Sequence, residues 1–144
     1  MQSSASDLGM QLTVARVHDE VAVDQAVNAI AREGDAGLIF PSDPFTATRL
    51  KQMVDIAAHY ALPAVYPFRS FAESGGLLSY GVDLLSQYAQ AASYIDRILK
   101  GVKSSDLPVQ TPTKFQLVVN LKTAKALGLL IPPALLAQAD ETIE

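Results

Sequence analysis

The sequence lacks cysteine, long apolar runs and clustered metal-binding side chains. The absence of cysteine excludes disulfides, zinc–thiolate sites and cysteine nucleophiles. No apolar run approaches the roughly 20 residues that a transmembrane helix needs. The N-terminal residues also lack the basic head and apolar stretch of a signal peptide. We therefore expect a soluble chain that carries no export signal itself.

Histidine is scarce, since His18 and His59 are the only two in the chain. His18 belongs to the run "HDE", whose three residues are adjacent in sequence rather than convergent in space, so we interpret them as a solvated turn and expect no metal site. His59 lies near the predicted end of a helix, where a contact with the helix dipole is favoured over catalysis.

Charge is also limited, with 15 acidic and 11 basic residues and a net charge of −4. The basic residues are scattered along the chain, which argues against nucleic acid as a partner. What the chain does have is apolar material. A length of 144 residues with 49% hydrophobic residues predicts one domain (1–144) with a real core.

The periodicity of apolar residues predicts an alternation of strands and helices. Strands are expected at 10–17, 36–40, 62–68, 77–78 and 114–120, and helices at 21–32, 46–60, 83–100, 121–129 and 132–144. The continuous apolar run at 36–40 suggests a strand covered on both faces. This order predicts the α/β class, a three-layer sandwich with a mostly parallel sheet.

The helix at 83–100 is the most strongly periodic element. Its apolar stripe from Leu84 to Leu99 is broadened by alanines and is wider than one small sheet needs. We expect the segment 83–101 to pack on another lobe or on a partner chain. An extended connector follows at 102–114, because Pro108 and Pro112 disfavour helix there.

Ligands of open parallel sheets bind beyond the carboxyl ends of the strands, where loops and helix N-termini converge. Three such loops are predicted here, at 41–45, 67–71 and 79–83, and we expect them on one rim of the sheet. The candidate ligand-binding residues are Ser42, Asp43, Phe68, Arg69, Ser79, Tyr80 and Asp83.

Each candidate also has a purely structural interpretation. Ser42 and Asp43 could cap the helix that begins near Pro44, and Asp83 suits a helix N-cap. Tyr80 could pack against its neighbours or form a ring-stacking wall. Arg69 is an exposed charge by default, or it could pair with a ligand carboxylate.

Enzyme motifs are not found in the sequence. There is no Gly-x-Ser-x-Gly elbow, no P-loop and no Gly-x-Gly-x-x-Gly fingerprint. We therefore predict a protein that is not an enzyme and that needs no cofactor.

The segments "SYG" (79–81), "LPVQTPTKFQLVVNLKTAKALGL" (107–129) and "IPPALLA" (131–137) together resemble a known family. They are similar to the C-terminal part of ABC-transporter substrate-binding proteins of the tryptophan/tyrosine-binding type. "DAGLIFPSDPF" and "HYALPAVYPFRSFAESGG" extend the resemblance upstream.

The resemblance implies a periplasmic-binding-protein-like (type I) C-terminal lobe. It further implies a periplasmic or lipoprotein receptor that holds a small solute, such as an amino acid, between two lobes and presents it to an ABC permease. The seven candidate residues would then face the solute. The predicted junction at 79–83 would lie at the crossover between the lobes.

The chain departs from the family pattern, since a complete N-terminal lobe and a central strand of the C-terminal sheet are not found in it. We therefore expect a fragment or truncated product. A sheet without an internal strand, together with an exposed helix stripe, predicts a homodimer, with or without exchanged elements.

Two other functions remain open from the residues alone. One is the ligand-sensing domain of a LacI-type transcription regulator, although the chain has no helix-turn-helix or basic segment. The other is a flavodoxin-like enzyme or signalling domain, which would need a phosphate-binding loop or a nucleophile with its base.

Overall fold

The computed structural model describes residues 2–144. The chain divides into two compact units, a first that ends at Asp35 and a second, Ala36–Glu144. The candidate residues all belong to the second unit. Within residues 2–144, every helix is too short or too polar to cross a membrane.

The first unit contains two helices, α1 (Gln2–Asp7) and α2 (Glu20–Ala31). The predicted helix at 21–32 is thus confirmed within one residue at each end. Asp19 caps α2, since its Oδ1 accepts a hydrogen bond from the Ala22 N–H at 2.8 Å. Val23 and Val27, four residues apart on one face, are the buried residues of α2.

The prediction of a strand at 10–17 is wrong: this segment has no helix or strand. Met10 and Val14, which the alternation placed on the buried face, are both exposed. A strand needs a neighbour for its backbone N–H and C=O groups, and the sheet order includes no strand from this unit. Alternating residues alone therefore do not make a strand here.

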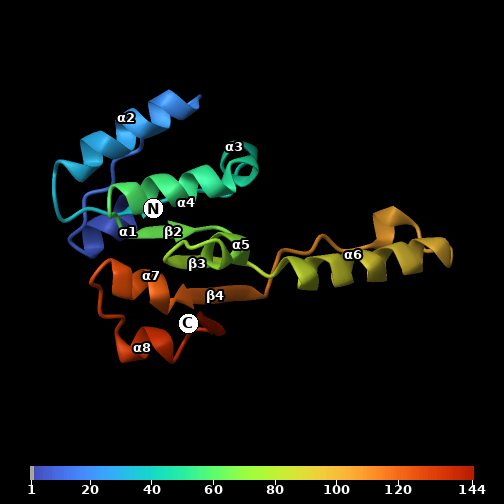
Figure 1. The fold of residues 1–144 in the computed structure, drawn as a ribbon. Helices are drawn as coiled ribbons and strands as arrows, with labels where there is room; N and C mark the ends of the chain where they lie inside the picture. Colours follow the sequence, from blue (N-terminus) through green and yellow to red (C-terminus); the bar gives the residue numbers. More distant parts are fainter. Residues whose placement is uncertain (1) are drawn as a thin grey trace. The chain divides into compact units, whose positions relative to one another are not determined.

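The second unit is built on one five-stranded sheet in the order β1-β2-β3-β4-β5 (Figure 1). The strands are β1 (Leu38–Ile39), β2 (Ala64–Tyr66), β3 (Leu78–Val82), β4 (Phe115–Asn120) and β5 (Glu141–Ile143). All neighbouring pairs are parallel except β3 and β4, which are antiparallel. The mostly parallel α/β sheet with flanking helices is as predicted.

The helices of this unit are more numerous than predicted. They are α3 (Pro44–Thr48), α4 (Leu50–His59), α5 (Arg69–Glu73), α6 (Leu84–Leu99), η1 (Ser104–Asp106), α7 (Leu121–Ala126) and α8 (Pro133–Leu136). The helix predicted at 46–60 begins two residues earlier and is interrupted at Arg49, whose φ of −117° and ψ of 31° are not helical. The loop predicted at 67–71 instead contains the start of α5.

The C-terminal residues correct a second prediction. The helix predicted at 132–144 ends at Leu136, and the last residues form β5. β5 pairs with Val118, Val119 and Asn120 of β4, which are all buried. This pairing with a buried strand outweighs the weak helical preference of the segment.

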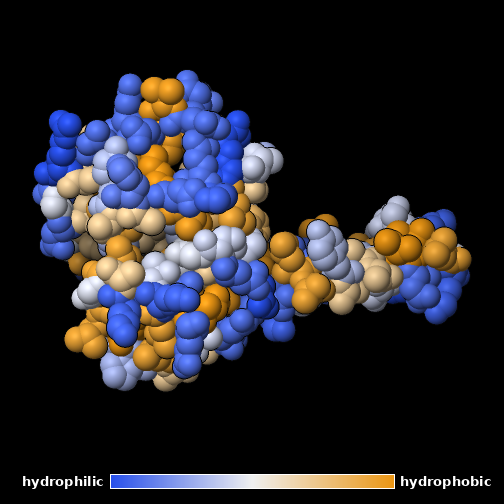
Figure 2. All heavy atoms as spheres, in the orientation of Figure 1, coloured by the Kyte–Doolittle hydropathy of each residue, from blue (hydrophilic) through white to orange (hydrophobic). Residues whose placement is uncertain are grey.

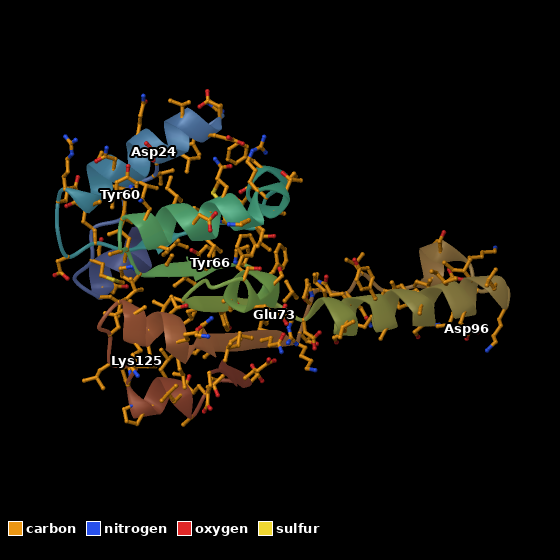
Figure 3. The ribbon with its side chains drawn as sticks, viewed as in Figure 1. Asp24, Tyr60, Tyr66, Glu73, Asp96 and Lys125 are labelled. Carbon is orange, nitrogen blue, oxygen red and sulfur yellow. The ribbon has the colours of Figure 1, made fainter. Side chains whose placement is uncertain are left out.

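The core of the second unit contains stacked aromatic rings. Tyr66, labelled in Figure 3, is 1% exposed, and its ring lies 5.1 Å from those of Phe40 and Phe71. Its hydroxyl donates to the Met53 carbonyl at 3.4 Å. β1 differs from the prediction, because Leu38 is buried while Ile39 is 66% exposed, so this strand is covered on one face only.

Helix α6 extends away from the sheet, and the residues that follow it run back alongside it to β4 (Figure 1). None of its 16 residues is buried. The Tyr94 hydroxyl donates to the Pro108 carbonyl at 2.5 Å and so ties the helix to the returning segment. We call α6 and residues 100–113 the arm; hydrophobic residues lie along it in Figure 2.

Candidate functional site

The carboxyl ends of three strands meet at one edge of the sheet. β1, β2 and β3 are mutually parallel, so the residues that follow them lie at the same edge. A cleft of about 200 Å³ opens there, between the β2–α5 turn and the β3–α6 junction. Its lining residues are Pro67, Phe68, Arg69, Ser70, Gly81, Val82, Asp83, Leu84, Leu85 and Gln116.

Phe68, Arg69 and Asp83 are the predicted site residues that this cleft brings together. Phe68 is half-buried and stands immediately before α5. Its ring supplies an apolar wall next to two side chains of opposite charge. Such a wall with a few convergent polar groups is typical of small-molecule sites.

Arg69 is held by two carboxylates. Its guanidinium lies 2.9 Å from Glu73 on the same helix and 3.0 Å from Glu141 on β5. Glu73 is labelled in Figure 3 at this edge of the sheet. The positive charge is thus balanced within the protein, and an anionic ligand would have to compete with these two carboxylates.

Asp83 has two structural partners. Its Oδ1 accepts a hydrogen bond from the Ser86 N–H at 3.2 Å, which caps α6, and its Oδ2 lies 2.7 Å from the Lys114 ammonium. The hydrogen bond from Lys114, followed by that from Ser86, lowers the pKa of Asp83, and the same ion pair raises the pKa of Lys114. Asp83 therefore stays ionised at neutral pH.

Asp83 and Lys114 also join the two segments at the base of the arm, one leaving β3 and the other entering β4. The Asp83 N–H donates to the Lys114 carbonyl at 3.0 Å, so the chain that leaves the sheet and the chain that returns are joined through backbone and side chain. The base of the arm is the one place where the cleft and the arm share residues.

Gly81 shapes the floor of the cleft. A Cβ atom at this position would lie 1.8 Å from the Pro67 carbonyl oxygen, far inside van der Waals contact. Only glycine allows β3 to approach the turn after β2 this closely. An isolated glycine within a strand is a sequence signal for such an approach, and it could have identified this position in advance.

Ser79 and Tyr80 do not line the cleft, which corrects the predicted loop at 79–83. β3 continues through Val82, so Ser79 lies within the strand at 2% exposure. Tyr80 points to the other side of the strand, is 57% exposed and stacks on Phe115 with centroids 5.7 Å apart.

Ser42 and Asp43 lie after β1 and outside the cleft lining. Asp43 is the N-cap of α3: its Oδ1 accepts from the Thr46 N–H at 3.0 Å and its Oδ2 from the Thr46 hydroxyl at 2.7 Å. The backbone hydrogen bond is the main reason why the pKa of Asp43 is lowered. Ser42 is exposed.

Most other lining residues are neighbours in sequence of the predicted ones, but Gln116 is not. It comes from β4, at the start of that strand, and reaches the cleft because β4 runs antiparallel to β3. Nothing in the sequence pattern signals this pairing direction.

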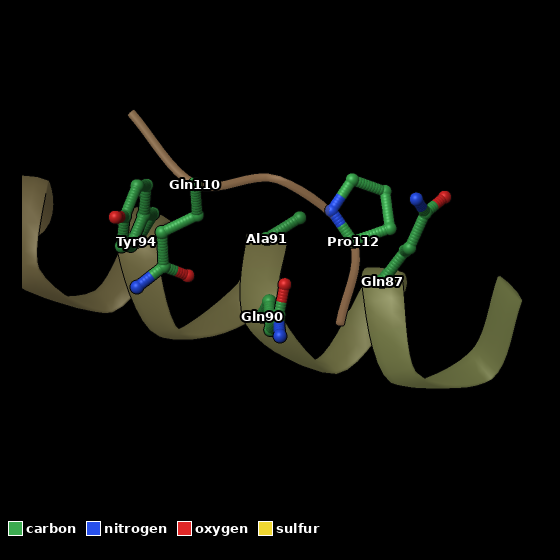
Figure 4. Close-up of a pocket in the computed structure, with 6 residues that line it drawn as sticks. All are labelled: Gln87, Gln90, Ala91, Tyr94, Gln110 and Pro112. Atoms are coloured by element: carbon green, nitrogen blue, oxygen red, sulfur yellow. The ribbon is translucent and has the colours of Figure 1, made fainter. Parts of the chain in front are cut away.

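A second, shallow hollow lies along the arm, between α6 and the returning segment (Figure 4). Its lining residues are Gln87, Gln90, Ala91, Tyr94, Gln110 and Pro112. It is open to solvent and contains no charged side chain. Among residues 2–144, no three histidine, aspartate or glutamate side chains converge as a metal site would require.

A mostly parallel α/β sheet with a cleft at its carboxyl edge is the arrangement of periplasmic-binding-protein-like lobes. Residues 1–143 match the model of the family described as ABC transporter substrate binding protein. The chain therefore belongs to this family. A comparison with curated proteins gives no match.

Solved structures agree with this assignment. A conserved domain protein from Vibrio cholerae is 30% identical with a TM-score of 0.84, over 98% of this chain and 47% of that one. An ABC domain in complex with L-Trp from Streptococcus pneumoniae is 25% identical with a TM-score of 0.85, over 99% and 49%. A ligand-free, open substrate-binding protein with adhesive properties from Clostridium difficile shares the fold, with 22% identity, a TM-score of 0.68 and coverages of 99% and 47%.

The chain spans about half the length of these solved structures.

Proposed function

We propose that the chain is one lobe of the substrate-binding component of an ABC importer. It holds a small solute against a second lobe and presents it, outside the cytoplasm, to the permease. The observation that supports this most directly is the cleft at the carboxyl edge of the sheet, lined by Phe68, Arg69 and Asp83, in a chain of this family.

The size of the cleft supports a divided site. About 200 Å³ is smaller than the roughly 300–1,000 Å³ of typical small-molecule sites. One lobe of a two-lobed receptor would provide such a partial site. The segment 83–101, which is α6 with its flanking residues, then faces the second lobe or a second copy of the chain.

We infer that the solute is an amino acid with an apolar side chain. The Streptococcus pneumoniae relative was solved with L-Trp. In the cleft, Phe68 would stack on the side chain, Arg69 would face the carboxylate and Asp83 the ammonium group. Glu73 and Glu141 neutralise Arg69, and Lys114 neutralises Asp83. The cleft therefore has no excess positive charge, which suits a zwitterion better than an anion.

The test is thermal unfolding of the chain in the presence of amino acids, nucleosides and sugars. We expect a rise in Tm with aromatic or large apolar amino acids only. A ligand at 100 times its Kd stabilises the folded state by about 2.7 kcal/mol. Phe68→Ala should abolish the rise, whereas Lys51→Gln, which removes an exposed ion pair on α4, should retain it. A folded chain whose Tm no solute class raises would contradict the proposal.

A homodimer is also part of this proposal. The exposed apolar face of α6 supports it, and the dimer would give the partial cleft a second wall.

A further inference from the structure

Arg69 lines the cleft and also contacts helix α5 and strand β5. Its Nε donates to Glu73 Oε1 at 3.1 Å, and its Nη2 lies 2.9 Å from the same oxygen. Nη2 also donates to Glu141 Oε1 at 3.2 Å and lies 3.0 Å from Oε2. All of these contacts use Nε and Nη2, and Nη1 bonds to none of residues 2–144. Its two N–H groups therefore remain for a molecule in the cleft.

The two carboxylates that hold Arg69 differ in origin. Glu73 lies four residues further along α5, which is the ordinary spacing of a helix ion pair, as for Lys51 and Asp55 on α4. Glu141 lies 72 residues away in sequence and reaches Arg69 from β5. Helix pairing alone would neutralise Arg69, so the second carboxylate adds a negative charge that the cation does not need.

The backbone around Glu141 is fixed by β4. Glu141 pairs with Val118 in the parallel ladder. The preceding residue, Asp140, bonds to Leu117 in both directions: its N–H donates to the Leu117 carbonyl at 2.9 Å, and its Oδ2 accepts from the Leu117 N–H at 2.8 Å. The carboxylate of Glu141 is therefore presented to Arg69 from a rigid element.

The ionised side chains at the cleft carry more negative than positive charge. Arg69 and Lys114 are opposed by Glu73, Asp83 and Glu141, a sum of −1. The side chains of Arg69 and its two carboxylates are between 39% and 48% exposed, so these ion pairs contribute little to stability. Their charge still acts on a ligand in the cleft, where it disfavours an anion.

We propose that Glu73 and Glu141 determine the charge selectivity of the cleft, which accepts an amine or a zwitterion and rejects a ligand whose only charge is a carboxylate. Arg69 offers Nη1 to the ligand carboxylate while the two glutamates neutralise the guanidinium. An ammonium group on the same ligand offsets the excess negative charge, and an isolated anion cannot. The inference rests on the proposed binding of an amino acid in this cleft and adds the residues that select the zwitterion.

Three ligands that share one ring test this selectivity. L-tryptophan is a zwitterion, tryptamine a cation and indole-3-propionate an anion at neutral pH. Each is titrated into the ¹⁵N-labelled chain, and the affinity is taken from the chemical-shift changes. We expect the anion to bind at least about tenfold more weakly than L-tryptophan, the order of effect of one unit charge in a partly exposed site.

The informative variant is the double substitution Glu73→Gln and Glu141→Gln. Each amide keeps the shape of the side chain and an oxygen that accepts from Arg69, while two negative charges are removed. The affinity for indole-3-propionate should rise at least about tenfold, and that for tryptamine should fall by a similar factor. In 1 M NaCl, where the Debye length is about 3 Å, both changes should largely disappear.

Two controls separate a local effect from a change in total charge. Asp55→Asn removes a carboxylate from the exposed pair on α4, outside the cleft, and should leave all three affinities within about twofold. Arg69→Gln, added to the double variant, should abolish the gained binding of indole-3-propionate, because the gain acts through the released guanidinium.

The same order of affinities in the double variant and the unsubstituted chain would overturn the inference, and so would a gain that Asp55→Asn reproduces. If L-tryptophan does not bind the unsubstituted chain, the proposed amino-acid binding fails. Binding of indole-3-propionate gained by the double variant would even then support the role of the glutamates, and no gain would overturn it. Binding of L-tryptophan with unchanged selectivity in the double variant would overturn the inference alone.

Discussion

Gly81 has the closest backbone approach among the described glycines, and it defines the floor of the cleft. The added methyl of Gly81→Ala would meet the Pro67 carbonyl, which is fixed backbone rather than a flexible side chain. We expect the free energy of unfolding to fall by about 3 kcal/mol or more, at the upper end of overpacking effects.

Gly128→Ala provides the comparison for this prediction. Gly128 has a φ of +68° and open space around its Cβ position, so alanine there costs only the left-handed conformation, about 1–2 kcal/mol. Urea unfolding of both variants measures the difference. An equal loss in the two variants would mean that β3 moves away from the turn at little cost.

We expect the free energy of unfolding to fall at acidic pH, because Asp43 and Asp83 become protonated there. Both have a lowered pKa in the folded chain, so each stabilises the fold fully above the unfolded pKa of about 3.9. This contribution is lost as the pH falls through the lower folded value. Urea unfolding at pH 6 and pH 3 should show the loss.

Asp43→Asn is the informative variant for this pH effect, because its amide oxygen can still accept from the Thr46 N–H while the titration is removed. It should make the difference in stability between pH 6 and pH 3 smaller. The same difference as in the unsubstituted chain would show that Asp43 does not contribute to it.

How much of the site could be predicted depends on how far each strand continues. Phe68, Arg69 and Asp83 follow from the rule that ligand sites lie beyond parallel strand ends. The same rule predicted Ser79 and Tyr80, but they lie outside the cleft, because hydrogen bonding to antiparallel β4 carries β3 on through Val82. Gln116 was not predictable, since its place in the cleft depends on a pairing between residues far apart in sequence.

At the scale of elements, Asn120 joins the end of β4 to two others. It is 4% exposed; its Oδ1 caps α7 by accepting from the Thr123 N–H at 2.9 Å, and its Nδ2 donates to the Ala72 carbonyl of α5 at 2.9 Å. Asn120→Ala should lower the free energy of unfolding by about 1–3 kcal/mol, from the lost cap and the lost buried hydrogen bond to the Ala72 carbonyl, which keeps its bond from the Gly75 N–H.

Gln138→Ala is the control for Asn120. Its Nε2 donates to the Ala134 carbonyl at 3.1 Å, but on the surface, where water replaces the bond, so the loss should stay within about 0.5 kcal/mol. Urea unfolding at neutral pH distinguishes the two. Similar losses would mean that the two hydrogen bonds of Asn120 stabilise the fold no more than one surface hydrogen bond does.

The predictable elements are those whose evidence is local. The apolar stripe from Leu84 to Leu99, with Asp83 as N-cap, predicted α6. Gly34 marked the end of α2, and Asn120 and Gly128 marked the two ends of α7. The predictions of a helix at 132–144 and a strand at 10–17 were wrong, because a strand depends on a distant partner. The last residues have such a partner in β4, whereas 10–17 pairs with no strand of the sheet.

At the scale of the whole molecule, stability is unevenly distributed. β4 lies between β3 and β5, and its Val118 and Val119 are fully buried. The segment at 10–18 has no regular secondary structure and belongs to the other compact unit. Local opening there needs little loss of packing, whereas β4 can open only when the sheet unfolds.

Amide hydrogen exchange should separate these two regions. We expect the amides of 11–18 to exchange within about tenfold of their unfolded rates, and those of 117–120 to be protected at least about 1,000-fold, as exchange through global unfolding requires. Peptides from α2, whose helical hydrogen bonds should give intermediate protection, provide the internal control. Protection at 11–18 as high as in β4 would show that this segment pairs as a strand in solution, as its alternation of apolar residues predicts.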